Sequence, residues 1–205
     1  MRKTIYLVRH GETAANRDGI LQGWSDFPLC QEGEKQAQDL AARAKGIPLD
    51  AIYISDLMRT QQTAAPLAKE RNLSPVVLPG LREISFGRWE GRPFAEMKKE
   101  DPELLRKLFR EPTQADIGQS ETVEASQTRV WDAFRHIETH MEEGQTVLAI
   151  SHGGILRALL CHLLSMPLDA MWRLGLDNTA SVKVVCNDIA GYWVEDWNNR
   201  GPLMP

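Results

Sequence analysis

Short hydrophobic runs, with little alternation of polar and apolar residues, recur along this sequence. They lie at residues 4–8, 51–54, 76–78 and 146–150. Strands that are apolar on both sides are typical of a parallel sheet that is covered by helices on both faces. We therefore expect an α/β fold, a three-layer sandwich around a mostly parallel central sheet.

Between the runs, apolar residues recur every three or four positions, which predicts amphipathic helices. These helical segments are residues 31–46, 57–68, 123–141 and 153–164. Near the C-terminus, residues 181–186 and 192–197 are rich in β-formers and are separated by a turn, so we expect a closing hairpin.

No repeat, linker or low-complexity tract divides the chain, and 205 residues suit one domain over residues 1–205. Glycines and prolines interrupt residues 84–125, which predicts an irregular segment covering the site. We expect the tail, residues 198–205, to be loosely held.

Composition narrows the function classes. The net charge of −4 gives no general attraction to nucleic acid or to a membrane surface. The most apolar stretch, residues 155–164, is too short to cross a bilayer, and no signal peptide is evident. Cys30, Cys161 and Cys186 have no metal-ligand or disulfide spacing. We expect a cytoplasmic protein; whether it is a monomer or a homodimer stays open.

Polar residues follow three of the predicted strands. Arg9 and His10 follow the first strand, Arg59 lies one helical turn beyond the second, and His152 with Gly153 follows the strand at 146–150. Ligands of parallel α/β sheets bind at the carboxyl ends of the strands. We therefore expect these distant positions to meet at one edge of the sheet.

The residue types at these strand ends suit a phosphate ester. Arginine forms paired hydrogen bonds to phosphoryl oxygens and keeps its charge. A neutral histidine nitrogen is a competent nucleophile that forms a covalent intermediate. Two arginines neutralise a phosphate dianion by themselves, so we expect neither a metal ion nor another cofactor.

The motifs resemble those of the histidine phosphatase, or phosphoglycerate-mutase-like, superfamily. Residues 9–13 read Arg-His-Gly-Glu-Thr and are followed by Asn16; residues 55–60 read Ser-Asp-Leu-Met-Arg-Thr. Residues 151–154 read Ser-His-Gly-Gly, and Glu83 stands at the position of that family's proton donor. The resemblance extends from residue 3 to about 187, and three ordered motifs make it specific.

The resemblance implies roles for five catalytic residues. His10 would be the nucleophile, and Arg9 and Arg59 would clamp the phosphoryl group. His152 would donate to the phosphoryl oxygens, and Glu83 would protonate the leaving alcohol and then activate water.

The resemblance also implies a set of phosphate-binding positions. Asn16, Gln22 and Gly23 would complete the phosphate site, and Gly153 would offer its backbone N–H. A small soluble phosphomonoester is the implied substrate, and α-ribazole phosphate or a sugar phosphate is the class suggested by the most similar branch.

One stretch departs from the family pattern. Residues 118–121 read Gly-Gln-Ser-Glu where many relatives have Gly-Glu-Ser, so no substrate contact is assigned there. The segment after Glu83 is short, which favours the phosphatase branch over a phosphoglycerate mutase. A non-catalytic phosphate-binding regulatory module is the alternative of another class, although its site would be expected to have lost one of the five catalytic residues.

Other polar and aromatic residues have simpler interpretations. Glu83 lacks a local motif and could be part of a surface salt bridge. His136 and His140 have a spacing that can hold a metal, but they lie opposite the apolar stripe of their helix and have no third ligand. Among the tryptophans that could line a pocket, Trp24 and Trp89 lie in segments near the expected site.

Overall fold

A six-stranded sheet forms the centre of the molecule. The computed structural model describes residues 2–205. In sheet order the strands are β3 (Val76–Val77), β2 (Ala51–Ile54), β4 (Thr146–Ser151), β1 (Lys3–Arg9), β5 (Ser181–Asn187) and β6 (Gly191–Asn199). The first four are parallel to one another, and β5 and β6 are antiparallel to their neighbours.

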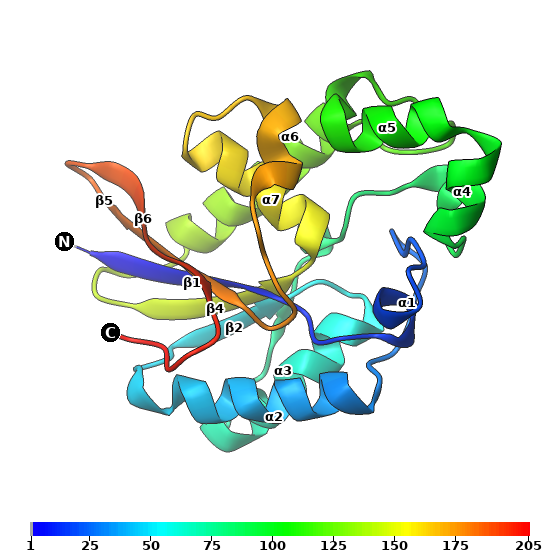
Figure 1. Cartoon of the computed structure of the whole chain (residues 1–205). Coiled ribbons are helices and arrows are strands. Elements are labelled where there is room, and N and C mark those ends of the chain that lie inside the picture. The colour runs from blue at the N-terminus through cyan, green and yellow to red at the C-terminus, as the bar shows by residue number, and fades with distance from the viewer. Residues whose placement is uncertain (1) are drawn as a thin grey trace.

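Helices cover both faces of this sheet, which confirms the expected three-layer α/β fold (Figure 1). On one face lie α2 (Gln31–Arg43) and α3 (Met58–Arg71). On the other lie α6 (Val123–Thr139) and α7 (Gly153–Leu163).

The burial of β1 explains its uninterrupted hydrophobicity. Ile5 and Leu7 belong to the core cluster that contains the apolar residues of α6 and α7. Tyr6 and Val8 belong to the cluster that contains the apolar residues of α2 and α3. Because successive side chains point to opposite faces, a strand covered on both sides has no solvent-facing position.

The segment expected to be irregular contains two helices, α4 (Phe94–Glu100) and α5 (Pro102–Arg110), joined by bends and single turns. Met97 and Leu108 attach it to the core on the α6–α7 side of the sheet. Figure 1 shows α4 and α5 beyond the end of the sheet at which β1 leads into α1 (Ala14–Arg17).

The C-terminal tail is bound rather than loose, which corrects the expectation for residues 198–205. Leu203 is 1% exposed and packs in the α2–α3 cluster. Arg43 donates hydrogen bonds to the carbonyls of Asn199 and Gly201, and Lys183 donates to Pro205. A single buried leucine and several backbone acceptors therefore hold a segment that has no regular structure of its own.

Candidate active site

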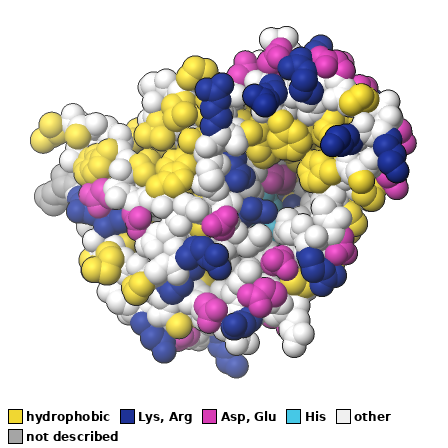
Figure 2. All heavy atoms as spheres, viewed as in Figure 1, with side chains coloured by type: hydrophobic (Ala, Val, Ile, Leu, Met, Phe, Trp, Pro, Cys, Tyr) yellow, Lys and Arg dark blue, Asp and Glu magenta, His cyan; other side chains and the backbone are white. Residues whose placement is uncertain are grey.

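A cavity lies beyond the carboxyl ends of β1 and β4, and in the space-filling view it forms a hollow with a histidine visible in it (Figure 2). Eight of the nine residues predicted from the sequence line it; His152 does not. The eight are Arg9, His10, Asn16, Gln22, Gly23, Arg59, Glu83 and Gly153. The sheet thus brings together residues that are distant in sequence, as expected from the strand ends.

His10 follows the end of β1 and is buried. Its Nδ1 lies 2.7 Å from the carbonyl of Gly11, which can only accept, so Nδ1 carries the proton and Nε2 keeps its lone pair. Burial, and then the charges of Arg59 and Arg9, lowers the pKa of His10 well below its ordinary value. The ring is therefore neutral and nucleophilic at Nε2 at physiological pH.

Arg9 ends β1 beside the start of α7. Its Nη1 donates to the carbonyl of Leu176 at 2.9 Å, whereas its buried Nε has no hydrogen-bond partner. A Cβ on Gly153 would lie 3.2 Å from this Nε, so the glycine leaves room for the guanidinium. An unpaired buried donor is costly unless a ligand satisfies it, which suits a site for an anion.

Arg59, on the first turn of α3, is completely buried. Its Nη1 and Nη2 donate to the carbonyls of Ser25 and Gly23, at 3.0 and 2.7 Å. Its Nε donates to Nδ1 of His152 at 3.1 Å. Burial lowers the pKa of Arg59 to about 10, so the guanidinium still carries its charge at neutral pH.

His152 lies behind this arginine. Its Nδ1 accepts from Arg59, so Nε2 carries the proton and donates to the hydroxyl of Ser55 at 2.8 Å. Its ring centroid lies 5.2 Å from that of His10. Both ring nitrogens are occupied, and the donation to phosphoryl oxygens implied by the resemblance stays a prediction.

Two amide side chains, Asn16 and Gln22, are oriented by Thr13, the N-cap of α1. The Thr13 hydroxyl lies 3.0 Å from Oε1 of Gln22 and 3.1 Å from Oδ1 of Asn16. The backbone N–H of Thr13 also donates to Oδ1 of Asn16. Because the amide oxygens face Thr13, the NH₂ groups are the ends available to an anion in the cavity.

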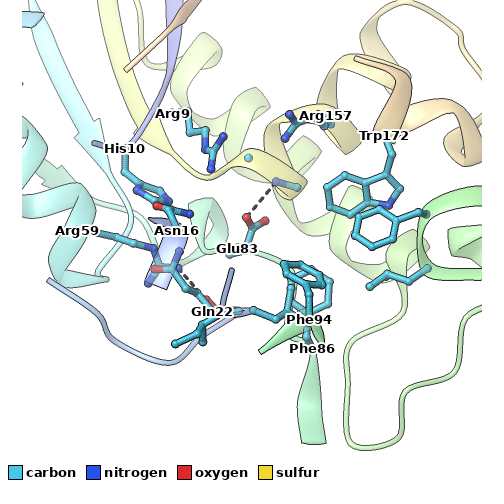
Figure 3. Close-up of a pocket in the computed structure, with 17 residues that line it drawn as sticks. Arg9, His10, Asn16, Gln22, Arg59, Glu83, Phe86, Phe94, Arg157 and Trp172 are labelled. Atoms are coloured by element: carbon cyan, nitrogen blue, oxygen red, sulfur yellow. Dashed lines mark hydrogen bonds between the residues drawn. The ribbon is translucent and has the colours of Figure 1, made fainter. Parts of the chain in front are cut away.

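Glu83 extends across the start of α7 (Figure 3). Its Oε2 accepts from the backbone N–H of Gly154 at 3.0 Å, and its Oε1 accepts from Ile155 at 2.7 Å and from Ile84 at 3.0 Å. A Cβ on Gly154 would lie 2.7 Å from Oε1, so this glycine allows the approach. The carboxyl group faces the cavity, and its described partners are backbone N–H groups rather than a surface arginine or lysine.

Arg157 was not predicted, although it lines the cavity four residues after Gly153, on the same face of α7. Its Nε donates to the carbonyl of Leu174 at 2.6 Å. Burial, and then the charge of Arg9, lowers the pKa of Arg157 to about 10. The spacing from Gly153 along an expected helix was the signal that could have identified this residue.

Aromatic side chains form the other end of the cavity, where Figure 3 shows Phe94 and Trp172 on the side opposite His10 and Arg59. The ring centroids of Phe94 and Phe109 lie 5.9 Å apart, and those of Phe109 and Trp172 lie 5.3 Å apart. We name these three residues the aromatic wall. They come from α4, α5 and the turn Leu168–Arg173, so no local motif marks them.

Neither of the two tryptophans expected near the site from the sequence lines the cavity. Trp89 is buried in the core, and Trp24 donates from Nε1 to the carbonyl of Glu83 at 2.6 Å without lining the cavity. The tryptophan that lines the cavity is instead Trp172. The ring centroids of His136 and His140, at the end of α6, lie 4.1 Å apart, with the ring planes tilted by 37°.

The part of the chain that the structure describes, residues 2–205, contains no group of three or more His, Cys, Asp or Glu side chains placed to hold a metal ion. Within the same residues, no helix is both long and apolar enough to cross a membrane. Besides His10, the ionisable side chains that line the cavity are those of Arg9, Arg59, Arg157 and Glu83.

The fold and the site define a class of enzyme: a hydrolase of phosphate esters, built on an α/β sheet, with a buried neutral histidine among guanidinium groups. Residues 5–200 match the model of the Histidine phosphatase superfamily (branch 1). The chain belongs to this superfamily. The resemblance of the three motifs is thus confirmed over nearly the whole chain.

Known relatives include proteins named as phosphatases and proteins named as probable phosphoglycerate mutases. The chain is 34% identical over 173 residues to the adenosylcobalamin/α-ribazole phosphatase of Escherichia coli K12, covering 84% of this chain and 85% of that protein. It is 35% identical over 180 residues to a Cronobacter sakazakii protein named a probable phosphoglycerate mutase, covering 88% and 83%. The crystal structure of the α-ribazole phosphatase from Shigella flexneri superposes with a TM-score of 0.87 at 30% identity, covering 100% of both chains. The protein is a phosphatase of small phosphate esters.

Proposed function

We propose that the protein hydrolyses a phosphomonoester through a phosphohistidine on His10. The observation that carries this proposal is the tautomer of His10, whose Nε2 lone pair is free beside Arg9 and Arg59 in the cavity. The unpartnered Nε of Arg9 and the NH₂ groups of Asn16 and Gln22 supply donors for the phosphoryl oxygens.

The first step forms a bond from His10 Nε2 to phosphorus and breaks the bond from phosphorus to the ester oxygen. Glu83 gives its proton to the departing oxygen, and the guanidinium groups stabilise the charge of the transferring group. In the second step Glu83, now a carboxylate, takes a proton from water. The resulting hydroxide attacks phosphorus and releases inorganic phosphate with a neutral His10.

The aromatic wall supports a substrate with a flat apolar body, and we propose an ester of the α-ribazole phosphate kind over a sugar phosphate. A phosphoglycerate has no flat apolar group that would contact this wall, so the same observation disfavours the mutase alternative.

Trapping of the intermediate tests the mechanism. Rapid quenching with labelled substrate should give an acid-labile, base-stable phosphate on the peptide that contains His10, with and without a strong chelator, because we propose that no metal takes part. His10→Ala should abolish both the adduct and turnover. Near-normal turnover by this variant would contradict the mechanism and would show that another nucleophile attacks phosphorus. No turnover of any ester by the parent protein would favour the non-catalytic binding module.

Substitution in the aromatic wall tests the substrate class. Phe109→Ala should lower kcat/KM for α-ribazole phosphate about tenfold, because aromatic contacts are worth roughly 1 kcal/mol or more. It should change kcat/KM for glycerol phosphate by less than about twofold, since that ester is too small to reach the wall. Leu164→Ala is the matched control, since Leu164 has the same 39% exposure as Phe109 but does not line the cavity. Equal effects on both substrates would exclude the wall from substrate selection.

In the cell, we propose a cytoplasmic enzyme, since Cys30, Cys161 and Cys186 are free thiols, two of them buried. Unpaired thiols suit a reducing compartment. The proposed mechanism uses residues of one chain, so it applies to a monomer and to a homodimer alike.

A further inference from the structure

Arg129, on α6, uses all five of its N–H groups within the protein. Nε and Nη2 donate to the two carboxylate oxygens of Glu121, at 2.8 and 2.7 Å. Nη1 donates to the carbonyls of Gly80 and Arg82, and Nη2 also donates to the carbonyl of Glu83. Arg129 does not line the cavity, so it cannot act on a bound substrate directly.

The backbone to which Arg129 donates hydrogen bonds belongs to the segment that carries Glu83. Four consecutive carbonyls accept from side chains: those of residues 80, 82 and 83 from Arg129, and that of Leu81 from the Ser151 hydroxyl at 2.7 Å. Trp24 adds a second donor to the carbonyl of Glu83. This backbone has only single-turn structure here, so side chains rather than a helix or strand ladder fix its position.

The partner of Arg129 comes from the stretch where the sequence departs from the family pattern. Glu121 is 15% exposed, and its backbone N–H donates to the carbonyl of Ser85. A paired Arg–carboxylate contact fixes the plane of the guanidinium, and with it the direction of the remaining three N–H groups. Glu121 therefore aims Arg129 at the backbone of residues 80–83.

We infer that Arg129, aimed by Glu121, is a positioning residue for the proton donor Glu83. The inference rests on the proposed role of Glu83. A general acid contributes only when its proton lies on the path to the leaving oxygen, and a shift of about 1 Å costs on the order of a hundredfold. Arg129 acts through the Glu83 backbone, whereas the N–H groups of α7 hold the carboxylate itself.

The test uses leaving groups of graded basicity. For the full-length protein, pre-steady-state release of the first product is measured with p-nitrophenyl, phenyl and benzyl phosphate. Arg129→Lys keeps the positive charge, but a lysine cannot form the paired contact with the Glu121 carboxylate. We expect release from benzyl phosphate to slow about 10- to 100-fold and release from p-nitrophenyl phosphate by less than about threefold, because nitrophenolate leaves without a proton. Glu121→Gln should likewise slow release from benzyl phosphate more than release from p-nitrophenyl phosphate.

Two controls separate positioning from a general loss of structure. Arg43→Lys removes another arginine that holds three backbone carbonyls, those of Thr179, Asn199 and Gly201, on the other side of the sheet. It should destabilise the protein without changing the ratio between benzyl and p-nitrophenyl phosphate. Inhibition by vanadate, which probes the phosphate end, should be unchanged in the Arg129 and Glu121 variants.

A double-mutant cycle decides the inference. If Arg129 acts through Glu83, adding Arg129→Lys to Glu83→Gln should cost little beyond the single Glu83 change. If Arg129→Lys slows release from all three substrates equally, the inference is overturned and the proposed function is left intact. The same holds if the effects of Arg129→Lys and Glu83→Gln are additive in the double variant. If Glu83→Gln itself slows all three substrates equally, the proton-donor role fails and the inference fails with it. Should Arg129→Lys not fold, Glu121→Gln and its cycle with Glu83→Gln give the same decision.

Discussion

Two histidines at this site, His10 and His152, are buried next to positive charges. Burial and then Arg59 lower the pKa of both His10 and His152 well below the ordinary value of 6.5. An unperturbed histidine would be partly protonated in mild acid, and a protonated His10 could not attack phosphorus. The cost of burying these rings is small near neutral pH and grows as the solution becomes acidic.

This cost predicts a pH dependence of stability. Below about pH 6.5 the unfolded chain binds protons at both histidines and the folded protein does not, so stability falls as pH falls. The free energy of unfolding should drop by up to about 1.4 kcal/mol per pH unit for each histidine, between about pH 6.5 and 5.5. Urea titrations at several pH values across this range measure the change in the free energy of unfolding. His10→Gln should remove about half of the slope, and an unchanged slope would show that His10 titrates normally.

Among the elements, the N-terminus of α7 contributes to the site in three ways. It supplies Gly153 beside Arg9, the backbone N–H groups that hold Glu83, and Arg157 one turn later. The backbone N–H groups at the start of a helix lack partners within the helix and favour a negative charge. Within the motif at residues 151–154, Gly154 therefore binds the Glu83 carboxyl group, and Gly153 and Gly154 both line the cavity.

Gly154→Ala tests this arrangement. The added Cβ would lie 2.7 Å from Oε1 of Glu83, so the carboxylate must move away from the helix. Turnover of benzyl phosphate should fall about tenfold or more, whereas turnover of p-nitrophenyl phosphate should change far less. Gly175→Ala is the control, because a Cβ at that position would meet no other atom within 4 Å. Normal turnover of benzyl phosphate by Gly154→Ala would show that the glycine is not needed for Glu83.

At the scale of the whole molecule, the C-terminal residues pack against β1 on the α2–α3 side of the sheet. Leu203 packs in the cluster with Val8 and Leu40, and the hydroxyl of Tyr6 bonds the carbonyl of Met204. The last residues thus close one side of the α2–α3 layer (Figure 1). This packing lies away from the cavity, so it bears on stability rather than on chemistry.

Leu203→Ala should lower the free energy of unfolding by about 2–5 kcal/mol, the usual cost of a leucine removed from a core. Met204→Ala should change it by less than about 0.5 kcal/mol, since Met204 is 64% exposed. Thermal and urea denaturation measure both values. Equal, small effects would mean that the tail is bound only through its backbone. Initial rates at low temperature should be the same in both variants as in the parent protein.

The sequence alone determined the fold class and most of the phosphate end of the cavity. Runs such as Thr4–Val8 must be buried on both faces, and the rule that ligands bind at strand ends then brings His10, Arg59 and Gly153 together. These signals are local, since each depends on the order of neighbouring residues.

Only the tertiary structure decided the aromatic wall, the place of His152 behind Arg59, and the packing of Leu203. It also showed that Arg129 holds the backbone of Glu83. Each depends on contacts between segments that are far apart in the chain, where neighbouring residues carry no periodicity or motif. A lone phenylalanine, arginine or leucine looks the same in a sequence whether it faces solvent, a core or a substrate, and packing alone distinguishes the three.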